Sequence, residues 1–533
     1  MNASIGLTTA QVSLVAAGPG DPGLLTVCAV DRLVRADVIV TDPECEPMAR
    51  AHARPEAEVV VAVDADGQVA DHADRVRLVI EPATQGLVVV RLMAGDPVLD
   101  GSLALEATAL AEASIAYDVA PGVSTVTGSA AYAGFALTGG RAREVRVVDA
   151  HDPEVDWTGL ADPHATLVVL DGAERALEIC RLLVLGGRDA RTPVAITRNS
   201  TTVDQRSLLS TLGEVASALK AAKGEVGPGV LVVGEVVSQC PRMAWFETKP
   251  LFGWRVLVPR TKEQAGTLSE ALRSYGAVPV EVPTISVEPP RTPQQMERAV
   301  HGLVSGRYQW VAFTSANAVR AVKERFDQYG LDSRAFAGLK VAAVGEQTAA
   351  LLRSFGIVPD LVPSGEQSTA GLLEEWPDYD AAFDPINRVF LPRADIATET
   401  LAAGLAQLGW EVDDVTAYRT VRAAPPSAEI REAIKGGGFD AVVFTSSSTV
   451  RNLVGIAGKP HSSTVVACIG PQTAKTAEEN GLRVDVLPET PSVAALAAAL
   501  AGHGEALRRH AIEHGETAWR PGRRRGGSRR KAT

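Results

Sequence analysis

Val-Ala-Phe-Thr-Ser-Ala-Asn-Ala-Val at positions 311–319 recurs as Val-Val-Phe-Thr-Ser-Ser-Ser-Thr-Val at positions 442–450. Each copy combines an apolar run, a short polar turn and a stretch with helical spacing. Each therefore predicts a β-strand followed by a helix. One such pair can arise by chance, so the question is whether other segments recur in the same order.

Three further pairs of segments do so. They are Arg255–Arg260 with Arg388–Arg393, Ala343–Ala349 with Cys468–Ala474, and Leu361–Ser364 with Val486–Glu489. Four repeats in one order indicate two homologous α/β units. Two such units form a cleft between the carboxyl ends of their strands, where open α/β sheets bind ligands.

The first half of the chain also alternates strand-like apolar runs with helix-like stretches, and throughout the chain this pattern predicts parallel α/β sheets. A proline and polar residues at 245–254 separate the halves and predict an exposed junction. A chain of 533 residues is too long for one core, so we expect three or four domains.

Composition narrows the class of protein. The chain is 46% hydrophobic and 22% charged, as in ordinary globular proteins. Its sequence contains no apolar stretch near the ~20 residues of a membrane span, and its N-terminus does not resemble a secretory signal. Five scattered cysteines without C-x-x-C spacing predict neither a disulfide framework nor a zinc site. We therefore expect a cytoplasmic protein without a metal.

A net charge of −12 argues against nucleic acid as the main partner, because phosphate binding requires clustered Lys and Arg. The exception is the tail 503–533, with Arg523–Arg525 and Arg529–Lys531. Its composition predicts a solvated, disordered terminus, and contact with nucleic acid or a membrane surface is the alternative.

Hydroxyl-bearing turns follow strands at equivalent places in both repeats. A Thr-Ser or Gly-x-x-Thr turn after a strand presents N–H groups and hydroxyls at a helix N-terminus, which favours anions. Simple N-capping explains any single one of them, but their recurrence predicts convergence on one cleft. Arg260, Lys262 and Arg393 lie at or just past strand ends, where each could add positive charge or simply be a solvated surface residue.

Several of these phrases resemble uroporphyrinogen-III synthase. They are Phe-Thr-Ser-Ala-Asn-Ala-Val (313–319), Ala-Val-Gly-Glu-Gln-Thr-Ala (343–349), Leu-Pro-Arg-Ala-Asp (391–395), Thr-Ala-Tyr-Arg-Thr (416–420) and Phe-Thr-Ser (444–446). The resemblance implies two flavodoxin-like domains joined by two crossing strands within 248–502, and no cofactor or metal for this half. One domain would comprise about 254–285 and 421–502, and the other about 286–420.

Members of this family close the linear tetrapyrrole hydroxymethylbilane, with loss of water and inversion of the last ring. This chemistry needs an acid that assists the leaving hydroxyl and a binding site whose shape enforces the ring closure. The resemblance implies that Tyr418 is the acid, although a structural tyrosine at a hinge is the alternative. Thr348, Ser446 and Thr473 match family positions that bind acetate and propionate arms. The strand-end pattern adds the remaining candidate substrate-binding residues, which are Ser315, Arg260 and Arg393.

Three glycine-proline turns follow strands in the first half: Gly-Pro-Gly-Asp-Pro-Gly (18–23), Ala-Gly-Asp-Pro (94–97) and Ala-Pro-Gly-Val-Ser-Thr (120–125). In this order they resemble the S-adenosylmethionine-dependent tetrapyrrole methyltransferases, specifically uroporphyrinogen-III C-methyltransferase. The resemblance implies two α/β lobes within 1–247 that hold the methyl donor between them, usually in a homodimer. The cofactor-binding residues that it implies are Pro19, Gly95, Asp96, Leu99, Ser124, Thr125, Ala195 and Gly229.

The first half also departs from this family. The family's Tyr-Asp-Arg-Leu turn is Thr41-Asp42-Pro43-Glu44, which keeps the aspartate and loses the arginine. Its cationic Gly-Lys-Arg…His…Gln stretch has no clear counterpart between Val59 and Leu78, and a cofactor-lining methionine aligns with Asp171. Losing cations is costly where the substrate is a polyanion, since desolvated carboxylates need donors or positive charge.

The leading interpretation is a bifunctional enzyme of haem, sirohaem and cobalamin biosynthesis. Its synthase half makes uroporphyrinogen III, and its methyltransferase half converts that tetrapyrrole to precorrin-2. The alternative within these families is a synthase whose degenerate methyltransferase half serves cofactor sensing or dimerisation. A two-domain solute-binding module, from a different class, would predict a secretory signal or lipoprotein anchor, and neither is seen in the sequence.

Overall fold

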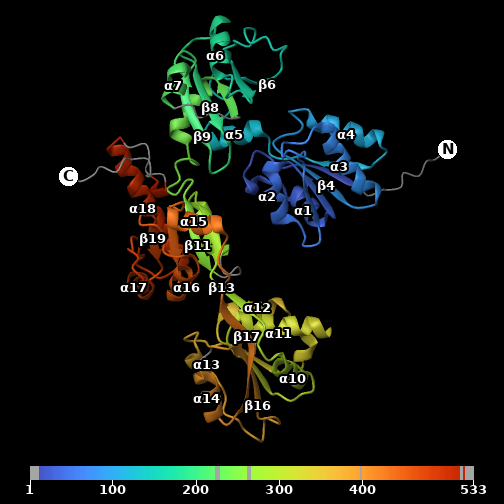
Figure 1. Cartoon of the computed structure of the whole chain (residues 1–533), viewed down its shortest axis with the longest axis vertical. Coiled ribbons are helices and arrows are strands. Elements are labelled where there is room, and N and C mark those ends of the chain that lie inside the picture. The colour runs from blue at the N-terminus through green and yellow to red at the C-terminus, as the bar shows by residue number, and fades with distance from the viewer. Residues whose placement is uncertain (1–10, 223–228, 261–265, 397–398, 516–519, 523–533) are drawn as a thin grey trace, which may run out of the picture. The chain divides into compact units, whose positions relative to one another are not determined.

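The chain forms two compact units (Figure 1). Unit 1 comprises Met1–Trp254 and Leu272–Val278, and unit 2 comprises Arg255–Ala271 and Pro279–Thr533. Each unit has two lobes, each built on one β-sheet with packed helices, which confirms the predicted α/β fold class. The computed structural model describes residues 11–222, 229–260, 266–396, 399–515 and 520–522.

The first lobe of unit 1 is a parallel five-stranded sheet of order β3-β2-β4-β1-β5. Every residue of β1, β2 and β4 is buried, as expected for strands covered on both faces. Helices α1 and α2 pack on one face, and α3 and α4 pack on the other (Figure 1). The elements are β1 (Val12–Ala16), α1 (Val27–Arg35), β2 (Val38–Thr41), α2 (Glu46–His52), β3 (Glu58–Val61), α3 (His72–Thr84), β4 (Val89–Met93), α4 (Ser102–Glu112) and β5 (Tyr117–Ala120).

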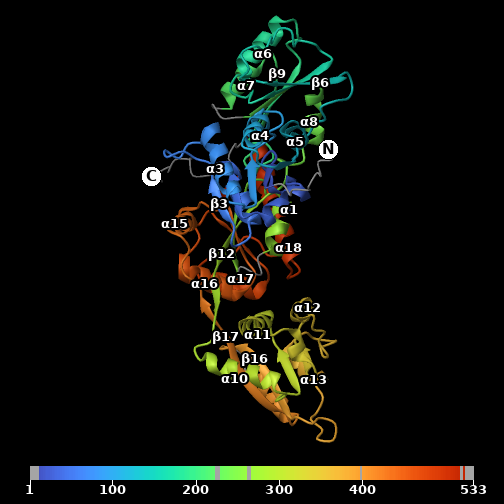
Figure 2. The same cartoon turned by 90° about the vertical axis from the view of Figure 1, so that its right-hand side faces the viewer.

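The second lobe of unit 1 has the strand order β6-β7-β10-β8-β9. Only β6 and β7 pair in parallel, so the prediction of parallel sheets throughout is wrong here. The short β8–β9 connection cannot cross over a sheet and makes a hairpin instead. Helices α6 and α7 cover one face, and α5 and α8 cover the other (Figure 2). The elements are α5 (Thr125–Ala133), β6 (Glu144–Asp149), β7 (Ala165–Leu170), α6 (Ala176–Leu185), β8 (Pro193–Arg198), β9 (Arg206–Thr211), α7 (Val215–Ala221), β10 (Gly229–Val233) and α8 (Cys240–Met243).

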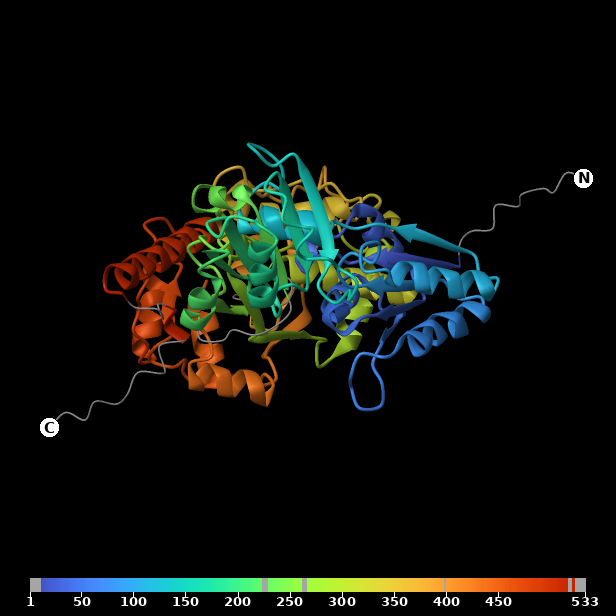
Figure 3. The same cartoon turned by 90° about the horizontal axis from the view of Figure 1, so that it is seen from above.

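Unit 2 contains a four-stranded sheet of order β12-β11-β18-β19, in which β11, β18 and β19 run parallel. Helix α18 belongs to this lobe and forms one uninterrupted helix, red in Figure 3. The elements are β11 (Arg255–Arg260), α9 (Gly266–Ser274), β12 (Val278–Pro283), α15 (Ala428–Gly436), β18 (Ala441–Phe444), α16 (Ser447–Ala457), β19 (Val465–Cys468), α17 (Pro471–Glu479) and α18 (Val493–Glu513).

The other lobe of unit 2 has a five-stranded sheet of order β13-β17-β16-β14-β15. Helices α10, α11 and α12 pack on one face, and α13 and α14 pack on the other (Figure 1). Trp310, Trp376 and Trp410 belong to the core on the α13 and α14 face. The elements are β13 (Ile285–Glu288), α10 (Pro293–Val304), β14 (Trp310–Phe313), α11 (Ala316–Tyr329), β15 (Lys340–Ala343), α12 (Glu346–Ser354), α13 (Thr369–Glu375), β16 (Arg388–Ala394), α14 (Thr400–Gln407) and β17 (Glu411–Arg422).

The internal repeat of unit 2 is visible in the backbone. The repeated phrases form β14 with α11 in one lobe and β18 with α16 in the other. The shortest repeated segment forms a single parallel bridge in each lobe. Leu361 bridges to Ala342 in one lobe, and Val486 bridges to Ala467 in the other. Equivalent segments thus occupy equivalent places, as the sequence predicts.

The predicted disordered tail from 503 is wrong over its first part. Helix α18 continues to Glu513, because Gly504 and Ala511 extend the buried stripe that begins before them. Farther on, Arg520 and the backbone N–H of Gly522 both contact the buried carboxylate of Asp440. Residues 523–533, which carry the densest arginine runs, lie outside the described residues.

The junction between the halves also differs from the exposed linker that the sequence predicts. Trp245 and Phe246 pack their rings against Tyr132 of unit 1, and Trp254 is fully buried. The ammonium of Lys249 lies 4.9 Å from the centre of the Trp245 ring, and burial lowers the pKa of this lysine. Apolar ring area, rather than the flanking polar residues, determines where this segment lies.

We expect Arg520→Ala to reduce the free energy of unfolding of unit 2 by about 2 kcal/mol, because a buried carboxylate loses a charged donor. Arg509→Ala is the control, since Arg509 makes only an exposed pair with Glu505. Hydrogen exchange of β18 peptides across a urea series measures both variants. Equal stability of the two variants would contradict the role of the Arg520–Asp440 pair.

Candidate functional site

Tyr418 and Ser315 meet at the carboxyl ends of β17 and β14. The Ser315 hydroxyl caps α11 by accepting from the N–H of Ala318 at 3.2 Å, and its oxygen lies 3.0 Å from the Tyr418 oxygen. Tyr418 is only 7% exposed. A capped helix start therefore fixes the position of a phenol in the lobe formed by β13–β17.

A register shift positions Tyr418 on its strand. Arg393 pairs with Thr416, whereas the next residue of β16, Ala394, pairs with Tyr418. The skipped residue, Ala417, bulges the end of β17 and changes which side chain faces the helix. Sequence spacing carries no signal for such a bulge.

Tyr418 also lines a cavity of about 430 Å³ bounded by α11 and by the segment that follows β13. Asn317 and Arg320, on the first turns of α11, line the same cavity. Neither residue was singled out by the sequence analysis, because an Asn or Arg early in a helix is common on any surface.

The other hydroxyl candidates occupy matching places in the two lobes. Thr348 lies in the first turn of α12 and Thr473 in the first turn of α17, and each is 5% exposed. Ser446 caps α16 by accepting from the N–H of Thr449 at 3.3 Å. The recurrence predicted from the sequence thus places each residue at a helix start after a parallel strand.

The candidate cations differ in what the structure describes. Arg393 forms a two-pronged ion pair with Asp414 on the neighbouring strand and is largely buried. Its charge is thus shared with a carboxylate of its own sheet. Arg260 is the last residue of β11, but its side chain and all of Lys262 lie outside the described residues.

In unit 1, the loops after β1, β4 and β5 converge. Gly18 accepts from the N–H of Gly95 at 3.2 Å, and Gly95 has a φ of +65° that favours glycine. A Cβ at Gly95 would lie 3.6 Å from the Thr125 hydroxyl, and one at Gly128 would lie 2.8 Å from the Pro19 ring. The structure therefore brings together three of the predicted cofactor residues, Pro19, Gly95 and Thr125.

The remaining predicted cofactor residues fall into two groups. Asp96, Leu99 and Ser124 belong to the same loops as Gly95 and Thr125, and Leu99 is 42% exposed. Ala195 and Gly229 belong to the second sheet, on β8 and β10. Ala195 is completely buried against α5, so its side chain offers no exposed surface to a ligand.

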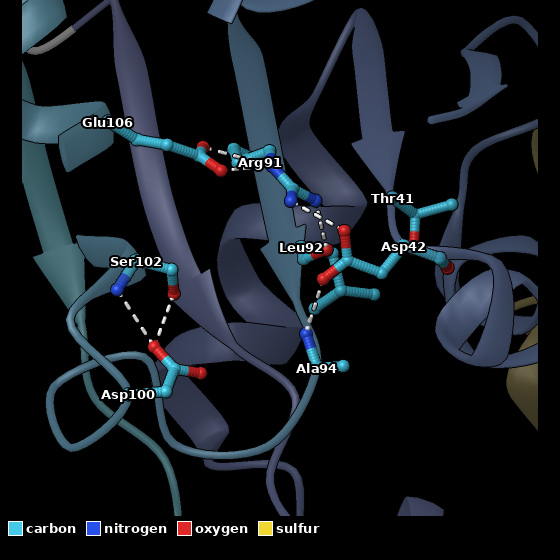
Figure 4. Close-up of polar contacts among 8 residues, drawn as sticks. All are labelled: Thr41, Asp42, Arg91, Leu92, Ala94, Asp100, Ser102 and Glu106. Atoms are coloured by element: carbon cyan, nitrogen blue, oxygen red, sulfur yellow. Dashed lines mark hydrogen bonds and ion pairs between the residues drawn. The ribbon is translucent and has the colours of Figure 1, made fainter. Parts of the chain in front are cut away.

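A buried guanidinium supports the loop after β4 (Figure 4). Arg91 has no exposed surface and lies between Asp42, at 2.5 Å, and Glu106, at 3.0 Å. Asp42 also accepts from the N–H of Ala94 at 2.8 Å, directly before Gly95. Burial alone would lower the pKa of Arg91, but Glu106 and Asp42 outweigh it and raise that pKa. The aspartate retained from the methyltransferase turn therefore positions the glycine loop.

The first loop of unit 1 is tied to its second lobe. The N–H of Asp21 donates to the Thr201 hydroxyl at 3.0 Å, and Tyr132 donates to the Asp21 carboxylate at 2.6 Å. Burial and the neighbouring Asp21 raise the pKa of Tyr132, which keeps the phenol protonated. The turn that carries Pro19 is thus held by donors and acceptors from α5 and from the β8–β9 connection.

The connection between β3 and α3, which is part of the stretch where the family's cationic residues have no clear counterpart, contains no Lys or Arg. Between β3 and α3 the chain runs Ala-Val-Asp-Ala-Asp-Gly-Gln-Val-Ala-Asp (62–71), and its acids bond mainly to their own backbone. Asp171, at the position of the family's methionine, has a φ of +50°. Both departures from the methyltransferase pattern are thus located at the ends of unit 1 strands.

The described residues contain neither a membrane-spanning helix nor a metal-binding cluster. No helix among them is long and apolar enough to cross a membrane. No group of three or more His, Cys, Asp or Glu side chains there could hold a metal ion.

Comparison with known proteins assigns both halves. Residues 266–498 match the family model of uroporphyrinogen-III synthase HemD, and residues 11–216 match that of the tetrapyrrole (corrin/porphyrin) methylases. The chain is 30% identical over 485 residues to the porphyrin biosynthesis protein HemD of Ruminiclostridium josui, covering 89% of this chain and 94% of that protein. The chain belongs to this HemD family.

Two further proteins are similar to parts of this HemD-family chain. The uroporphyrinogen-III C-methyltransferase of Bacillus subtilis is 31% identical over 365 residues, which is 67% of this chain and 74% of that protein. The crystal structure of uroporphyrin-III C-methyl transferase from Thermus thermophilus with S-adenyl homocysteine is 32% identical, covers 43% of this chain and 98% of that one, and has a TM-score of 0.36.

These matches confirm the predicted order, a methylase domain followed by a synthase domain, and a role in tetrapyrrole biosynthesis. Both families are enzymes. The bifunctional interpretation therefore agrees with the matches of this HemD-family chain, and the degenerate methyltransferase does not.

In unit 1, we expect Arg91→Met to reduce the free energy of unfolding by about 3–5 kcal/mol, because it leaves two buried carboxylates without their cation. Adding Glu106→Gln should restore part of that loss by removing one stranded charge. Arg191→Met is the control, since that side chain is 90% exposed. Urea-dependent hydrogen exchange of β4 and α4 peptides gives the measurement. A change below 1 kcal/mol for Arg91→Met would show that the pair is not needed.

Proposed function

We propose that this chain is a bifunctional enzyme of tetrapyrrole biosynthesis. Unit 2 cyclises hydroxymethylbilane to uroporphyrinogen III, and unit 1 methylates that product with S-adenosylmethionine to give precorrin-2. The observation that carries the proposal is the match to a HemD protein over nearly the whole length of both chains. Two observations support it: Ser315 meets Tyr418 in unit 2, and the loops that carry Pro19, Gly95 and Thr125 come together in unit 1.

In the synthase reaction, Tyr418 donates a hydrogen bond to the departing hydroxyl of the substrate. The C–O bond breaks, and the hydroxyl takes the proton and leaves as water. The Ser315 oxygen already accepts from Ala318, so its own hydrogen can bond the phenol oxygen. That arrangement leaves the O–H of Tyr418 directed to substrate, and the N-terminus of α11 favours the phenolate that remains. Ser315 is therefore a positioning residue.

The carboxylate arms of the substrate bind at the helix starts of unit 2. Thr348 and Thr473 are too buried to present much hydroxyl surface, so the first-turn N–H groups around them provide the contacts. Ser446 is more accessible and adds its hydroxyl. We retain Arg260 and Arg393 as further candidate substrate-binding residues, because a polycarboxylate favours cationic donors. The synthase reaction requires no cofactor.

The residues of unit 1 fit S-adenosylmethionine, which supplies a methyl group on a sulfonium. Gly95 lets the ligand approach the backbone, because no side chain fills the space before Thr125. The Asp96 carboxylate complements the positive charge or hydroxyls of the ligand, and Ser124 and Pro19 shape the adjoining turns. Leu99 and Gly229 complete the contact, and Ala195 supports it from the core.

We further propose a cytoplasmic enzyme that pairs as a homodimer through unit 1 and binds neither nucleic acid nor a membrane. Its substrates are small tetrapyrroles. Sedimentation of the full chain, compared with a variant lacking residues 1–247, tests the dimer. A monomeric full chain would exclude it.

A coupled assay tests the proposed function. Hydroxymethylbilane, generated in place by its synthase, is given to the purified chain with and without S-adenosylmethionine, and products are resolved as type I, type III and methylated species. Type III product that is dimethylated only with the methyl donor is the expected result. Type III alone would remove the methyltransferase activity from the proposal. Only the spontaneous type I isomer, with folded protein, would overturn the synthase assignment.

Tyr418→Phe should lower kcat of the cyclisation about 100-fold with little change in KM, because the variant keeps the ring and loses the proton donor. Tyr308→Phe is a matched control. It removes a buried phenol of the same lobe, bonded to Asp413 outside the cavity, and should leave kcat unchanged. A Tyr418→Phe enzyme with normal kcat would assign this tyrosine a purely structural role.

Gly95→Val should abolish binding of S-adenosylhomocysteine in calorimetry while cyclisation continues at the normal rate. The substitution forces a branched side chain into a left-handed backbone and fills the space in front of Thr125. Gly67→Val is the control, because Gly67 has a φ of +77° but faces open space. If both variants bind the nucleoside equally well, Gly95 does not line the cofactor site.

A further inference from the structure

Residues 245–247, here called the 245–247 segment, connect the two halves of the chain. They lie outside both family matches, which cover 11–216 and 266–498. By its contacts the segment belongs to unit 1. Each of its side chains is connected through one or two other residues to Asp21, which lies two positions after Pro19 in the first predicted cofactor loop.

The first connection runs through the ring of Tyr132. The centres of the Trp245 and Phe246 rings lie 5.0 Å and 4.6 Å from its centre, both edge to face. The Trp245 indole N–H also donates to the Ala131 carbonyl at 2.9 Å. Two rings packed in this way restrict the rotamer of the tyrosine. Tyr132 can then donate its hydroxyl hydrogen to the Asp21 carboxylate, at 2.6 Å.

The second connection runs through the amide of Gln205, which has no exposed surface. Its nitrogen donates to the Glu247 carboxylate at 2.9 Å, and its oxygen accepts from the N–H of Thr201 at 2.7 Å. The Thr201 hydroxyl in turn accepts from the N–H of Asp21 at 3.0 Å. Thr201 has a φ of +66°, which a β-branched residue adopts only where its surroundings impose it. The buried amide is part of those surroundings.

Both connections end on Asp21, which determines the course of the loop. The Asp21 carboxylate also accepts from the N–H of Gly23 at 2.8 Å and so caps the short helix Pro22–Leu24. On the other side of the loop, a Cβ at Gly128 would lie only 2.8 Å from the Pro19 ring, so α5 blocks movement of the ring in that direction. The bonds at Asp21 therefore decide how far Pro19 can shift.

We propose that the 245–247 segment positions the loop that carries Pro19 and so raises the affinity of unit 1 for S-adenosylmethionine. The segment acts through Tyr132 and Gln205, not by contact with the ligand. The inference rests on the proposed methyltransferase function, which gives Pro19 its role in binding the methyl donor. A loop that is held in its binding geometry loses less conformational entropy when the ligand binds, and this is the source of the added affinity.

The test is calorimetric binding of S-adenosylhomocysteine to the full chain. Tyr132→Phe keeps the ring, loses the hydroxyl hydrogen bond and should raise Kd about 10-fold. Trp245→Ala and Glu247→Ala should each raise Kd about 3- to 10-fold. Glu247→Gln keeps an oxygen for Gln205 and should restore most of the affinity. Met243→Ala is the control, since that side chain is 50% exposed, and should leave Kd unchanged.

A double-mutant cycle shows whether Trp245 acts through Tyr132. Adding Trp245→Ala to Tyr132→Phe should raise Kd by no more than about 2-fold further, because both changes affect the same connection. Adding Glu247→Ala to Tyr132→Phe should raise Kd by the full factor of the single variant, because it affects the other one. Full additivity of Trp245→Ala and Tyr132→Phe would contradict the connection through the phenol.

Hydrogen exchange separates positioning from folding. In the wild type, S-adenosylhomocysteine should slow exchange in peptides that cover 18–25 and also in those that cover 245–250, because coupling between two sites is reciprocal. In ligand-saturated Tyr132→Phe, the protection of 245–250 should decrease while that of 18–25 remains. Equal ligand-induced protection of 245–250 in both proteins would assign the phenol a purely structural role. This comparison decides the proposal even if Trp245→Ala does not fold.

The outcomes distinguish this inference from the proposed function. A folded wild-type chain that does not bind S-adenosylhomocysteine overturns the methyltransferase assignment, and the positioning role with it. A wild type that binds the nucleoside, with Tyr132→Phe, Trp245→Ala and Glu247→Ala all at the Kd of the control, overturns the positioning role alone.

Discussion

Helix starts that follow strands determine where this protein can bind its ligands. The first N–H groups of a helix have no partner within it, and where strands run parallel, successive helix starts lie along one edge of the sheet. In unit 2, serines cap α11 and α16, and threonines lie in the first turns of α12 and α17. A polycarboxylate suits that edge. Under the proposed function, amide groups at these helix starts offset the net charge of −12.

In unit 1, a buried ion pair positions the loop that follows a strand. Gly95 in the loop after β4 has no side chain that could anchor the backbone, so side chains from behind hold the loop. Asp42 does this through the Ala94 N–H, and Arg91 holds Asp42. A buried ion pair is a poor source of stability compared with apolar packing, because both ions lose their hydration. Its presence behind the glycine loop is therefore better explained by the geometry it imposes.

Sequence reasoning succeeded where local pattern and repetition carry the information. The repeat located β14, β18 and the helices after them. The strand-end pattern singled out Ser315, and the family resemblance singled out Tyr418, which the structure places 3.0 Å apart. Sequence reasoning failed where distant residues combine. Arg91 and Glu106 are fifteen positions apart on different elements, and neither looks unusual alone. The bulge at Ala417 produces no recognisable pattern in the spacing of residue types along the sequence. The antiparallel strand pairs in the second lobe of unit 1 were not predicted, because buried strands have the same apolar pattern in either direction.

Strand β17 extends into the connection between the two lobes of unit 2. It runs from Glu411 to Arg422, and its last residue pairs with Ile285 at the start of β13, so both crossings between the lobes are hydrogen-bonded side by side. Tyr418 lies four residues before the end of that strand. In a rigid-body rotation, a residue close to the axis moves less than residues farther from it. Any rotation of the lobes about these crossings would therefore carry Ser446 and Thr473 of the far lobe through a wide arc while the phenol stays nearly still.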